Sequence, residues 1–206
     1  FGGSAFEMDS VLSIIQAQPY KNLIIDLRDN AGGGIASAHA LGHYLIEEEL
    51  NIGYFISKKG FDSMGDNSID FESLPVSREK NTNKLLQVLL NVKGCKLMIE
   101  PSEKHFNGKI FVLTSNKTAS TCEPFVSGLK TNKLATIVGE STAGAMLAGT
   151  DFHTVSNIYL FIPIADYYTP EKKRLDKVGV APDIAVPVDE ALDYVIKMIA
   201  QSYNEY

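Results

Sequence analysis

The tightest constraint on the fold is a short apolar run that leads directly into a cluster of glycines. Residues 22–27 (NLIIDL) carry one charge near their end, as expected of a strand buried on both faces. The sequence RDNAGGG follows at residues 28–34, and residues 35–50 then repeat apolar side chains with a helical period. A strand, a glycine loop and a helix in this order predict the first half of a parallel βαβ unit, and therefore an α/β fold.

An apolar strand followed by a loop of small residues occurs twice more. Residues 109–114 (KIFVLT) precede TASTCEP at residues 118–124, which leads into a helical pattern that ends near residue 130. Residues 134–140 (LATIVGE) run into STAGAMLAGT at residues 141–150. Because ligands of open parallel sheets bind at the carboxyl ends of the strands, we expect the three loops to meet there.

The remaining segments predict that residues 1–206 form a single domain. Periodicity predicts further helices over residues 7–17, 84–92 and 189–202, and further strands over residues 51–57 and 95–100. Residues 151–168 are predicted to be a β-rich stretch, which precedes GVAPDIAV at residues 179–186. Residues 58–81 are polar, rich in Gly, Ser and Asp, and without a clear period, which predicts a long loop or flap. The sequence contains no internal repeat and no low-complexity linker.

The charge and hydropathy of the chain argue against two classes of partner. The net charge of −6 is spread along the chain, whereas a nucleic-acid partner normally requires a basic face. No apolar run approaches the ~20 residues that span a bilayer, so no membrane span is expected. Two cysteines, Cys95 and Cys122, are too few for a disulfide framework or a metal cluster and are expected to be buried thiols.

Two potential nucleophiles, Ser120 and Cys122, stand where the second strand gives way to a helix. A helix N-terminus offers unpaired N–H groups and a partial positive charge, which can stabilise an oxyanion. A capped helix explains TAST and Glu123 equally well, because Ser and Thr are common N-caps. The glycine loop is also ambiguous, since it could hold phosphate but matches neither the dinucleotide fingerprint nor the P-loop.

Four motifs taken together resemble one known family. They are LIIDLRDNAGGG, GKIFVLTSNKTASTCEPF, IVGESTAGA and GVAPDIAV, and they lie in this order between about residues 22 and 190. In order and spacing they resemble the tail-specific (C-terminal processing) serine proteases, which include the tricorn core protease and the interphotoreceptor retinoid-binding protein repeats. The resemblance implies a ClpP/crotonase-like α/β core with parallel βαβ units and a mixed sheet. It also implies hydrolysis of peptide bonds in a peptide or protein substrate, with no metal or organic cofactor.

The resemblance also implies roles for single residues. Ser120 matches the family's nucleophile, and the backbone N–H groups of Thr121 and Gly33 match its oxyanion hole. A glycine there lets a backbone N–H approach a substrate carbonyl without side-chain interference. Cys122 occupies a position that holds a small residue in the family, so it is expected to pack rather than react. Substrate contacts are expected from Gly32, Gly34 and Gly144.

The general base that a serine nucleophile needs is missing from its expected place. Bacterial and plant members resembling this chain use a lysine where Ala145 stands, and no lysine lies between Lys133 and Lys172. The tricorn-like branch uses a histidine upstream of the LIIDLR strand, and this chain has none before residue 22. The same branch supports that histidine with a Glu where Asp176 stands. Asp176 can orient an imidazole as Glu does, or it can be a solvated turn residue.

Four histidines lie further along the chain. His39 and His43 share a helix face with Glu47, but HALGH lacks the catalytic glutamate of the zinc-protease motif. Glu47 is also about 12 Å from His39 along the helix axis, so no metal site is expected. His105 lies in a polar loop, and His153 is the single in-chain candidate for the base.

Two main explanations of the missing base stay open. The chain begins FGGSAFEMDS, without an initiator Met or a targeting segment, so it is expected to be a core whose histidine lies in an N-terminal part of a longer protein. Alternatively, it is a degenerate member that retains the fold as a peptide- or ligand-binding module. A crotonase-like acyl-thioester enzyme and a thiol enzyme using Cys122 are further alternatives. Most relatives act outside the cytoplasm, which implies a secreted, periplasmic or cell-surface place, and the sequence does not indicate an oligomeric state.

Overall fold

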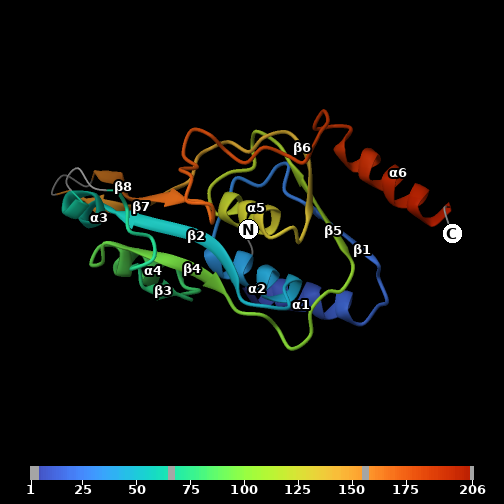
Figure 1. Cartoon of the computed structure of the whole chain (residues 1–206), viewed down its shortest axis with the longest axis horizontal. Helices are drawn as coiled ribbons and strands as arrows, with labels where there is room; N and C mark the ends of the chain where they lie inside the picture. Colours follow the sequence, from blue (N-terminus) through green and yellow to red (C-terminus); the bar gives the residue numbers. More distant parts are fainter. Residues whose placement is uncertain (1–4, 65–67, 155–157, 205–206) are drawn as a thin grey trace.

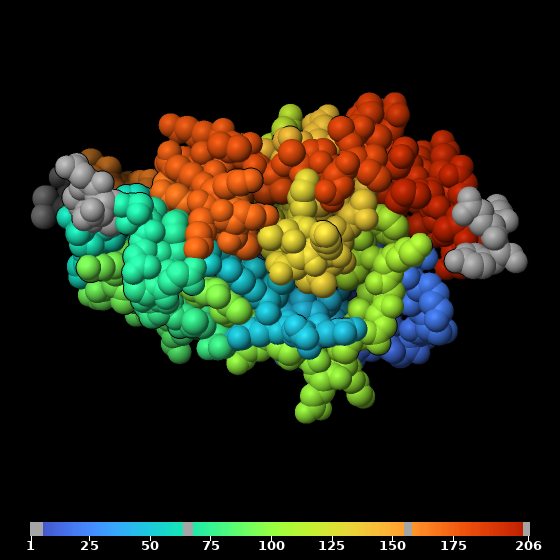
Figure 2. All heavy atoms as spheres, in the orientation of Figure 1, coloured from blue at the N-terminus to red at the C-terminus, as the bar shows by residue number. Residues whose placement is uncertain are grey.

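The computed structural model describes residues 5–64, 68–154 and 158–204. Figure 1 shows two groups of strands, with helices α2 (Ile35–Leu45) and α5 (Cys122–Thr131) between them and helix α6 (Ala191–Asn204) at one end. In the space-filling view, residues from the middle of the chain, in yellow, reach the surface between the orange C-terminal part and the cyan N-terminal part (Figure 2). In the described part of the chain, no helix combines the length and hydrophobicity needed to cross a membrane.

The first sheet is entirely parallel and has the order β1-β5-β6-β9. Its strands are β1 (Asn22–Asp26), β5 (Lys109–Thr114), β6 (Thr136–Gly139) and β9 (Ile184–Ala185). Strand β5, helix α5 and strand β6 form a parallel βαβ unit, as predicted. The carboxyl ends of β1, β5 and β6 therefore lie along one edge of this sheet.

The second sheet is mixed and has the order β3-β4-β2-β8-β7. Its strands are β3 (Val76–Ser77), β4 (Gly94–Ile99), β2 (Leu50–Ser57), β8 (Tyr159–Tyr168) and β7 (Leu147–His153). Strand β3 runs parallel to β4, and the other neighbours are antiparallel. A parallel sheet beside a mixed one confirms the predicted fold class.

The two inner strands of the parallel sheet, β5 and β6, are buried, whereas the edge strand β1 is only half-buried and Asp26 at its end is exposed, so the expectation that residues 22–27 are buried on both faces is wrong. In β5, Val112 and Leu113 have no exposed surface, which explains why this strand reads as a continuous apolar run. Helix α5 contributes Val126 and Leu129 to the larger core on one side, whereas α6 packs Ala191 and Val195 against β5 and β6 on the other. This packing fixes the end of β5, from which Ser120 follows.

Three further helices complete the described part of the chain, namely α1 (Ala5–Gln16), α3 (Lys58–Met64) and α4 (Thr82–Leu89). Two of them, α1 and α4, were predicted from their sequence patterns. Helix α4 begins where the Asn81 side chain accepts a hydrogen bond from the Lys84 N–H, and it buries Leu85 and Leu89, one turn apart. The helices predicted over residues 7–17, 84–92 and 189–202 are confirmed as α1, α4 and α6.

Two predictions about the N-terminal half are wrong. Residues 35–50 were expected to be one helix, but α2 ends at Leu45 and β2 begins at the buried Leu50. Strand β2 also does not complete the βαβ unit of β1, because it joins the mixed sheet while β1 pairs with β5. An apolar run records that a strand is buried but not which strand it pairs with.

The predicted loop over residues 58–81 contains regular structure. Helix α3 starts directly after β2, and its exposed Lys58 and Asp62 form an ion pair of 2.6 Å one turn apart. A Cβ built on Gly60 would lie 2.2 Å from the Lys93 carbonyl oxygen, so glycine permits the close approach of α3 to that segment. The polar composition concealed α3 because the helix has few apolar positions of its own. Residues 65–67 of the predicted loop lie outside the described residues.

Candidate active site

The three predicted loops meet at the carboxyl edge of the parallel sheet. We call them the glycine loop (residues 28–34), the serine loop (residues 115–121) and the third loop (residues 141–146). The Ala119 N–H donates to the Asn30 carbonyl at 3.2 Å, and the Thr121 hydroxyl donates to the Gly33 carbonyl at 2.7 Å. The Ala143 N–H donates to the Thr118 carbonyl at 2.9 Å. The prediction that these loops converge is therefore confirmed.

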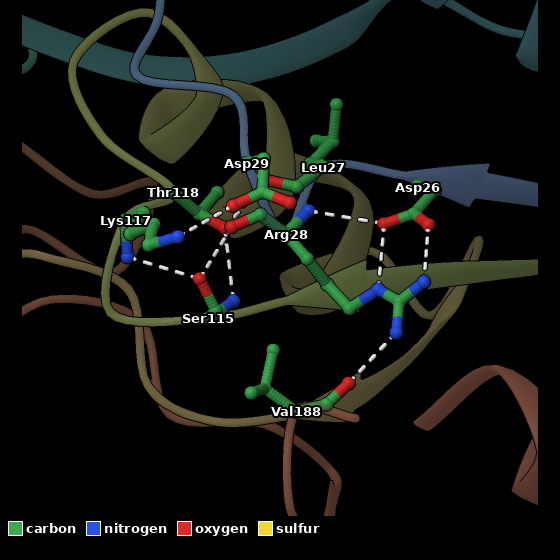
Figure 3. Close-up of polar contacts among 8 residues, drawn as sticks. All are labelled: Asp26, Leu27, Arg28, Asp29, Ser115, Lys117, Thr118 and Val188. Atoms are coloured by element: carbon green, nitrogen blue, oxygen red, sulfur yellow. Dashed lines mark hydrogen bonds and ion pairs between the residues drawn. The ribbon is translucent and has the colours of Figure 1, made fainter. Parts of the chain in front are cut away.

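Polar side chains hold the glycine loop to the serine loop (Figure 3). The Thr118 hydroxyl donates to the Leu27 carbonyl at 2.8 Å, and the Ser115 hydroxyl donates to the Arg28 carbonyl. The Thr118 hydroxyl oxygen also accepts a hydrogen bond from the Ser115 N–H at 2.9 Å, which stabilises the turn between these two residues. These bonds place the start of the serine loop against the end of β1.

A bidentate ion pair between Arg28 and Asp26 also stabilises the end of β1 (Figure 3). Arg28 donates from Nε and Nη2 to the two carboxylate oxygens of Asp26, at 2.9 and 2.6 Å, and from Nη1 to the Val188 carbonyl at 2.7 Å. The hydrogen bonds from Arg28 lower the pKa of the Asp26 carboxyl group. Arg28 thus connects the glycine loop to the segment between β9 and α6.

Ser120 has an uncommon backbone conformation. Its φ angle is +54°, in the left-handed region that non-glycine residues rarely adopt and that costs on the order of 1–3 kcal/mol. Helix α5 begins two residues later, at Cys122. Strained residues of this kind concentrate at functional sites, where the surrounding structure holds them in place.

The glycine loop lies directly against Ser120. Gly32 has a φ of +106°, and a Cβ built on it would lie 2.6 Å from the Ser120 Cβ and 3.1 Å from the Ser120 Oγ. A glycine at this position is therefore required for the loop to approach the serine so closely. Gly33 and Gly34, the next two residues, are exposed beside it.

Two backbone N–H groups near Ser120 are left without an acceptor. Within the described residues, neither the Thr121 N–H nor the Gly33 N–H donates a hydrogen bond, and the Ser120 hydroxyl has no partner. Gly33 is exposed and Thr121 is half-buried, so solvent or a ligand can reach this region. Unpaired donors beside a serine hydroxyl are what stabilisation of an oxyanion requires.

Gly144 has a different environment from the glycines of the glycine loop. It is buried, its N–H donates to Glu123 Oε1 at 2.7 Å, and its carbonyl accepts the Lys177 N–H at 2.6 Å. Its φ is +65°, and a Cβ there would lie 2.8 Å from the Val178 nitrogen. The Gly144 backbone therefore serves the packing of the third loop against residues 177–179.

Asp176 lies beside the third loop but does not contact Ser120. Its carboxylate is buried, and Oδ2 lies 3.3 Å from Nη2 of Arg174. The next residue, Lys177, bonds to Gly144 as described above. Asp176 is thus the neighbour of a residue that is hydrogen-bonded to the third loop. Because its side chain is buried, Asp176 is not a solvated residue, although it lies in a turn.

Three of the four histidines bond to groups other than Ser120. Their partners are the Met98 carbonyl for His39 (3.1 Å), the Glu100 carbonyl for His43 (2.6 Å) and the Glu47 carboxylate for His105 (3.1 Å). Burial lowers the pKa of His39, which keeps its imidazole neutral. Within the described residues, none of these three imidazoles hydrogen-bonds to the Ser120 hydroxyl.

His153 was the candidate base within the chain, and this prediction is wrong. It lies at the far end of β7, with its ring centroid 4.8 Å from that of Tyr159. A strand rises ~3.3 Å per residue, so His153 lies roughly 20 Å along β7 from Leu147, which follows the third loop. The β7–β8 hairpin carries the imidazole away from Ser120 instead of folding it back.

Lys117, three residues before Ser120, does not supply a base either. Its Nζ lies 2.8 Å from Asp29 Oδ1, and this hydrogen bond raises the pKa of the lysine (Figure 3). Lys117 therefore stays protonated at neutral pH and cannot accept a proton. Ala145, at the position of the family's lysine, is exposed on the third loop.

Cys122 is completely buried and donates weakly to the Asn30 carbonyl, with an Sγ–O distance of 3.4 Å. Burial raises the pKa of its thiol to about 11. At neutral pH the group is therefore a thiol rather than the nucleophilic thiolate. Its burial supports the expected packing role and argues against a thiol enzyme that uses Cys122.

Sequence reasoning missed the importance of Glu123. Its side chain has no exposed surface, and it accepts hydrogen bonds from both the serine loop and the third loop. The Ser120 N–H donates to Glu123 Oε2 (3.1 Å), and the Glu123 N–H donates to the Ser120 backbone carbonyl (2.8 Å), so only the glutamate half of a capping box is formed and the Ser120 hydroxyl takes no part in it. A Ser followed by Glu three residues later was the available signal, but it did not reveal the contacts with the third loop.

Comparison of the sequence with known protein families identifies the family to which this chain belongs. Residues 1–186 match the family described as Peptidase family S41. This chain belongs to peptidase family S41. The predicted resemblance to tail-specific proteases is confirmed, because the curated relatives of this S41 chain include carboxyl-terminal-processing peptidases.

The curated relatives are considerably longer than this S41 chain. Carboxyl-terminal-processing peptidase 2, chloroplastic, of Arabidopsis thaliana is 29% identical over 168 residues, which are 80% of this chain and 26% of the relative. The carboxyl-terminal-processing protease of Picosynechococcus sp. is 25% identical over 190 residues, which are 92% of this chain and 37% of the relative. This chain therefore spans between 26% and 37% of the length of these two relatives.

Solved structures support the fold of the S41 chain. The photosystem II D1 C-terminal processing protease matches with a TM-score of 0.61 and 18% identity, over 89% of this chain and 39% of that one. Mature CPAF complexed with lactacystin matches with a TM-score of 0.70 and 19% identity, over 98% and 48%. The tricorn protease matches with a TM-score of 0.55 and 20% identity, over 89% and 15%. The α/β core predicted from the motifs is thus the fold of S41 proteases.

Proposed function

We propose that this S41 chain is the core of a serine endopeptidase that cleaves peptide bonds through an acyl-enzyme at Ser120. The supporting observation is the strained Ser120, whose free hydroxyl lies against Gly32 and is followed by the unpaired N–H of Thr121. Ser120 Oγ attacks the peptide carbonyl carbon, and the carbonyl oxygen becomes an oxyanion. The N–H groups of Thr121 and Gly33 stabilise that oxyanion.

The proton of Ser120 then passes through a general base. The base takes the proton from Oγ during the attack and gives it to the amine that leaves when the C–N bond breaks. In the second half of the reaction the base takes a proton from water, the resulting hydroxide attacks the ester carbonyl carbon, and the base gives that proton to Oγ as the C–Oγ bond breaks and the acid product leaves. Because no lysine, histidine or carboxylate bonds to Ser120 Oγ within the described residues, we assign the base to a histidine outside this chain.

Asp176 is assigned as the carboxylate that orients this histidine. Asp176 is buried, and the N–H of the next residue, Lys177, donates to the Gly144 carbonyl, so the segment that carries Asp176 is attached to the third loop. A carboxylate of this kind selects the imidazole tautomer and stabilises the imidazolium ion. The greater length of the curated relatives, of which this chain covers 26% to 37%, supports a second segment that supplies the histidine.

The substrate is an extended peptide or protein segment. Gly32 and Gly34 flank the oxyanion donor of the glycine loop, where a side chain would obstruct the peptide. Strand β7 is the edge of its sheet and starts two residues after Ala145, so a peptide paired with it would be led towards Ser120.

The names of the Arabidopsis relatives, which state a chloroplast location, support an extracytoplasmic or lumenal compartment.

A second candidate function is binding of a peptide or ligand without turnover. The observation that favours it is Ala145, which leaves the serine without the lysine of the bacterial and plant branch. In this case the loops would hold a ligand while Ser120 stays unreactive. The two candidates predict different chemistry at a single hydroxyl group.

A serine-directed fluorophosphonate probe separates the two candidates. The full-length protein, this chain alone and a full-length Ser120→Ala variant are treated with the probe, with Ser141→Ala as a control because Ser141 is an exposed serine of the third loop. Labelling that is lost only in Ser120→Ala supports the peptidase. Absence of labelling in the full-length protein supports the binding module.

A further inference from the structure

Glu123 is a fully buried carboxylate with four hydrogen-bond donors and no cation. The donors to Oε1 are the Thr142 hydroxyl (2.6 Å) and the Gly144 N–H (2.7 Å). The donors to Oε2 are the Ser120 N–H (3.1 Å) and the Ala145 N–H (2.9 Å). Within the described residues no ion pair involves Glu123. A buried charge is tolerated only when hydrogen bonds replace its hydration, and here four donors match an acceptor-only carboxylate.

The direction of the Thr142 hydrogen bond is fixed by a second contact. The Thr142 hydroxyl oxygen accepts the Val180 N–H at 2.8 Å, so its own proton is available for Glu123. The Thr142 N–H in turn donates to the Val180 carbonyl at 3.1 Å. Glu123 is therefore connected through Thr142 to residue 180, and through Gly144 to Lys177, which follows Asp176.

The carboxylate contacts backbone on both sides of the serine site but not the reacting hydroxyl. Its Oε2 accepts hydrogen bonds from both the N–H of Ser120 and the N–H of Ala145, so a single oxygen atom connects the serine loop to the third loop. No contact links Glu123 to the Ser120 Oγ in the part of the chain that the structure describes. Its effect on chemistry must therefore pass through the backbone of the loops.

We propose that Glu123 is a positioning residue that holds the serine loop and the third loop in register. Its bond with the Ser120 N–H secures the left-handed backbone of that residue and directs the Thr121 N–H to the oxyanion. Its bonds with Gly144 and Ala145 hold the third loop against the serine loop, and the Lys177–Gly144 bond attaches the segment that carries Asp176 to the third loop. This assignment rests on the proposed function for its effect on catalysis, whereas the backbone ordering is independent of turnover.

The ordering is tested by amide hydrogen exchange in this chain. Glu123→Gln keeps the side-chain volume but places an NH2 group against the Gly144 N–H or against the N–H groups of Ser120 and Ala145. We expect exchange at least 10-fold faster at one or more of these three amides than in the unmodified chain. Glu190→Gln is the matched control, since Glu190 is an exposed carboxylate outside the three loops, and it should change none of them. Unchanged exchange at all three amides in Glu123→Gln would overturn the proposal.

A milder pair of variants keeps the test valid if Glu123→Gln does not fold. Thr142→Val removes one donor to Glu123, and Thr142→Ser retains it, so exchange at Gly144 should accelerate in the valine variant and recover in the serine variant. In the full-length protein, the same pair should lower kcat about 10-fold for valine, leave KM within about twofold, and restore kcat for serine. Equal exchange in both variants would contradict the proposal. If the exchange differs but Ser120→Ala leaves probe labelling intact, the ordering stands and the proposed serine chemistry fails.

Discussion

Gly32 and Ser120 lie in direct contact, because a Cβ built on Gly32 would lie only 2.6 Å from the Cβ of Ser120. The two residues belong to loops that are almost ninety positions apart in the sequence. Both have positive φ angles, +106° for Gly32 and +54° for Ser120. The proposed serine chemistry depends on this contact, since it sets the place of the neighbouring Gly33 N–H relative to the serine hydroxyl.

Replacing Gly32 with alanine should therefore displace the glycine loop. The clash and the positive φ together are expected to lower the free energy of unfolding by roughly 1–3 kcal/mol. The rate of fluorophosphonate labelling of the full-length protein should fall at least 10-fold. Chemical denaturation and labelling kinetics measure the two effects.

The control for this variant is two positions along the same loop. Gly34 has a φ of −71°, and a Cβ built on it meets nothing within 4 Å. Gly34→Ala should leave the free energy of unfolding within about 0.5 kcal/mol of the original value. Equal destabilisation by the two variants would show that the contact between Gly32 and Ser120 is not what makes the loop sensitive.

A lysine at position 145 should restore a base to this chain. Ala145 is exposed, and its N–H shares the Glu123 Oε2 atom with the Ser120 N–H, so its side chain starts close to the serine. A positioned general base contributes roughly 10²–10⁴-fold. Ala145→Lys should therefore increase the rate of fluorophosphonate labelling of this chain at least 100-fold.

The matched control is Ala143→Lys, which adds the same charge to an exposed position of the same loop. It should leave the labelling rate unchanged. The rate for Ala145→Lys should also rise with pH as the new lysine loses its proton, whereas a nonspecific charge effect would not follow that titration. Similar gains in both variants would argue against a base at position 145.

Cys122 should lower the stability of the protein at alkaline pH. Burial raises its pKa from 9.0 to about 11, so between these values the unfolded chain loses a proton that the folded protein retains. The stability that the protonated Cys122 thiol contributes is fully present below about pH 9 and is lost as the pH rises through about 11. Denaturation curves from pH 8 to pH 11 should show a decline that is smaller in Cys122→Ala than in the original chain.

The reactivity of the same thiol gives a second measurement. Iodoacetamide should modify Cys122 and Cys95 at pH 7 only after unfolding, because both are buried and the pKa of Cys95 is raised to about 12. Mass spectrometry after a timed reaction distinguishes the two sites. Rapid modification of Cys122 in the folded protein would reopen the thiol-enzyme alternative.

Arg28→Lys should destabilise the end of β1. Arginine holds Asp26 through two hydrogen bonds and the Val188 carbonyl through a third, and lysine cannot reproduce this planar arrangement (Figure 3). We expect a loss of about 1–2 kcal/mol, mainly from the unpaired Val188 carbonyl, since the Asp26 side chain is 45% exposed. Lys58→Ala, which breaks an exposed ion pair on α3, should cost only about 0.3–0.5 kcal/mol.

The acid side of the stability curve reports on the same pair. Because Arg28 lowers the pKa of Asp26 below 3.8, the carboxylate contributes stability above that pH, and this contribution is lost as the pH falls through the lowered value. Arg28→Lys should reduce the difference in stability between pH 5 and pH 2. An identical pH dependence in both proteins would mean that the pair contributes nothing measurable.

The sequence by itself determined the strands that end at the site and the chemistry gathered there. The apolar runs at residues 22–27, 109–114 and 134–140 correspond to β1, β5 and β6, because strands of a parallel sheet that is covered by helices are predominantly apolar, and β5 and β6 are buried. The small-residue loops that follow them carry the motifs of family S41. Both signals are local, so a single stretch of chain is sufficient to record them.

Only the tertiary structure decided how these parts are combined. It paired β1 with β5 rather than with β2, gave Ser120 its left-handed backbone, and carried His153 away along β7. It also made Glu123, which reads as an ordinary helix cap, the acceptor for two loops. Each of these features depends on contacts between segments far apart in the chain. The local pattern specifies that a group is buried or strained, whereas the partner that satisfies it is determined only when the whole core packs.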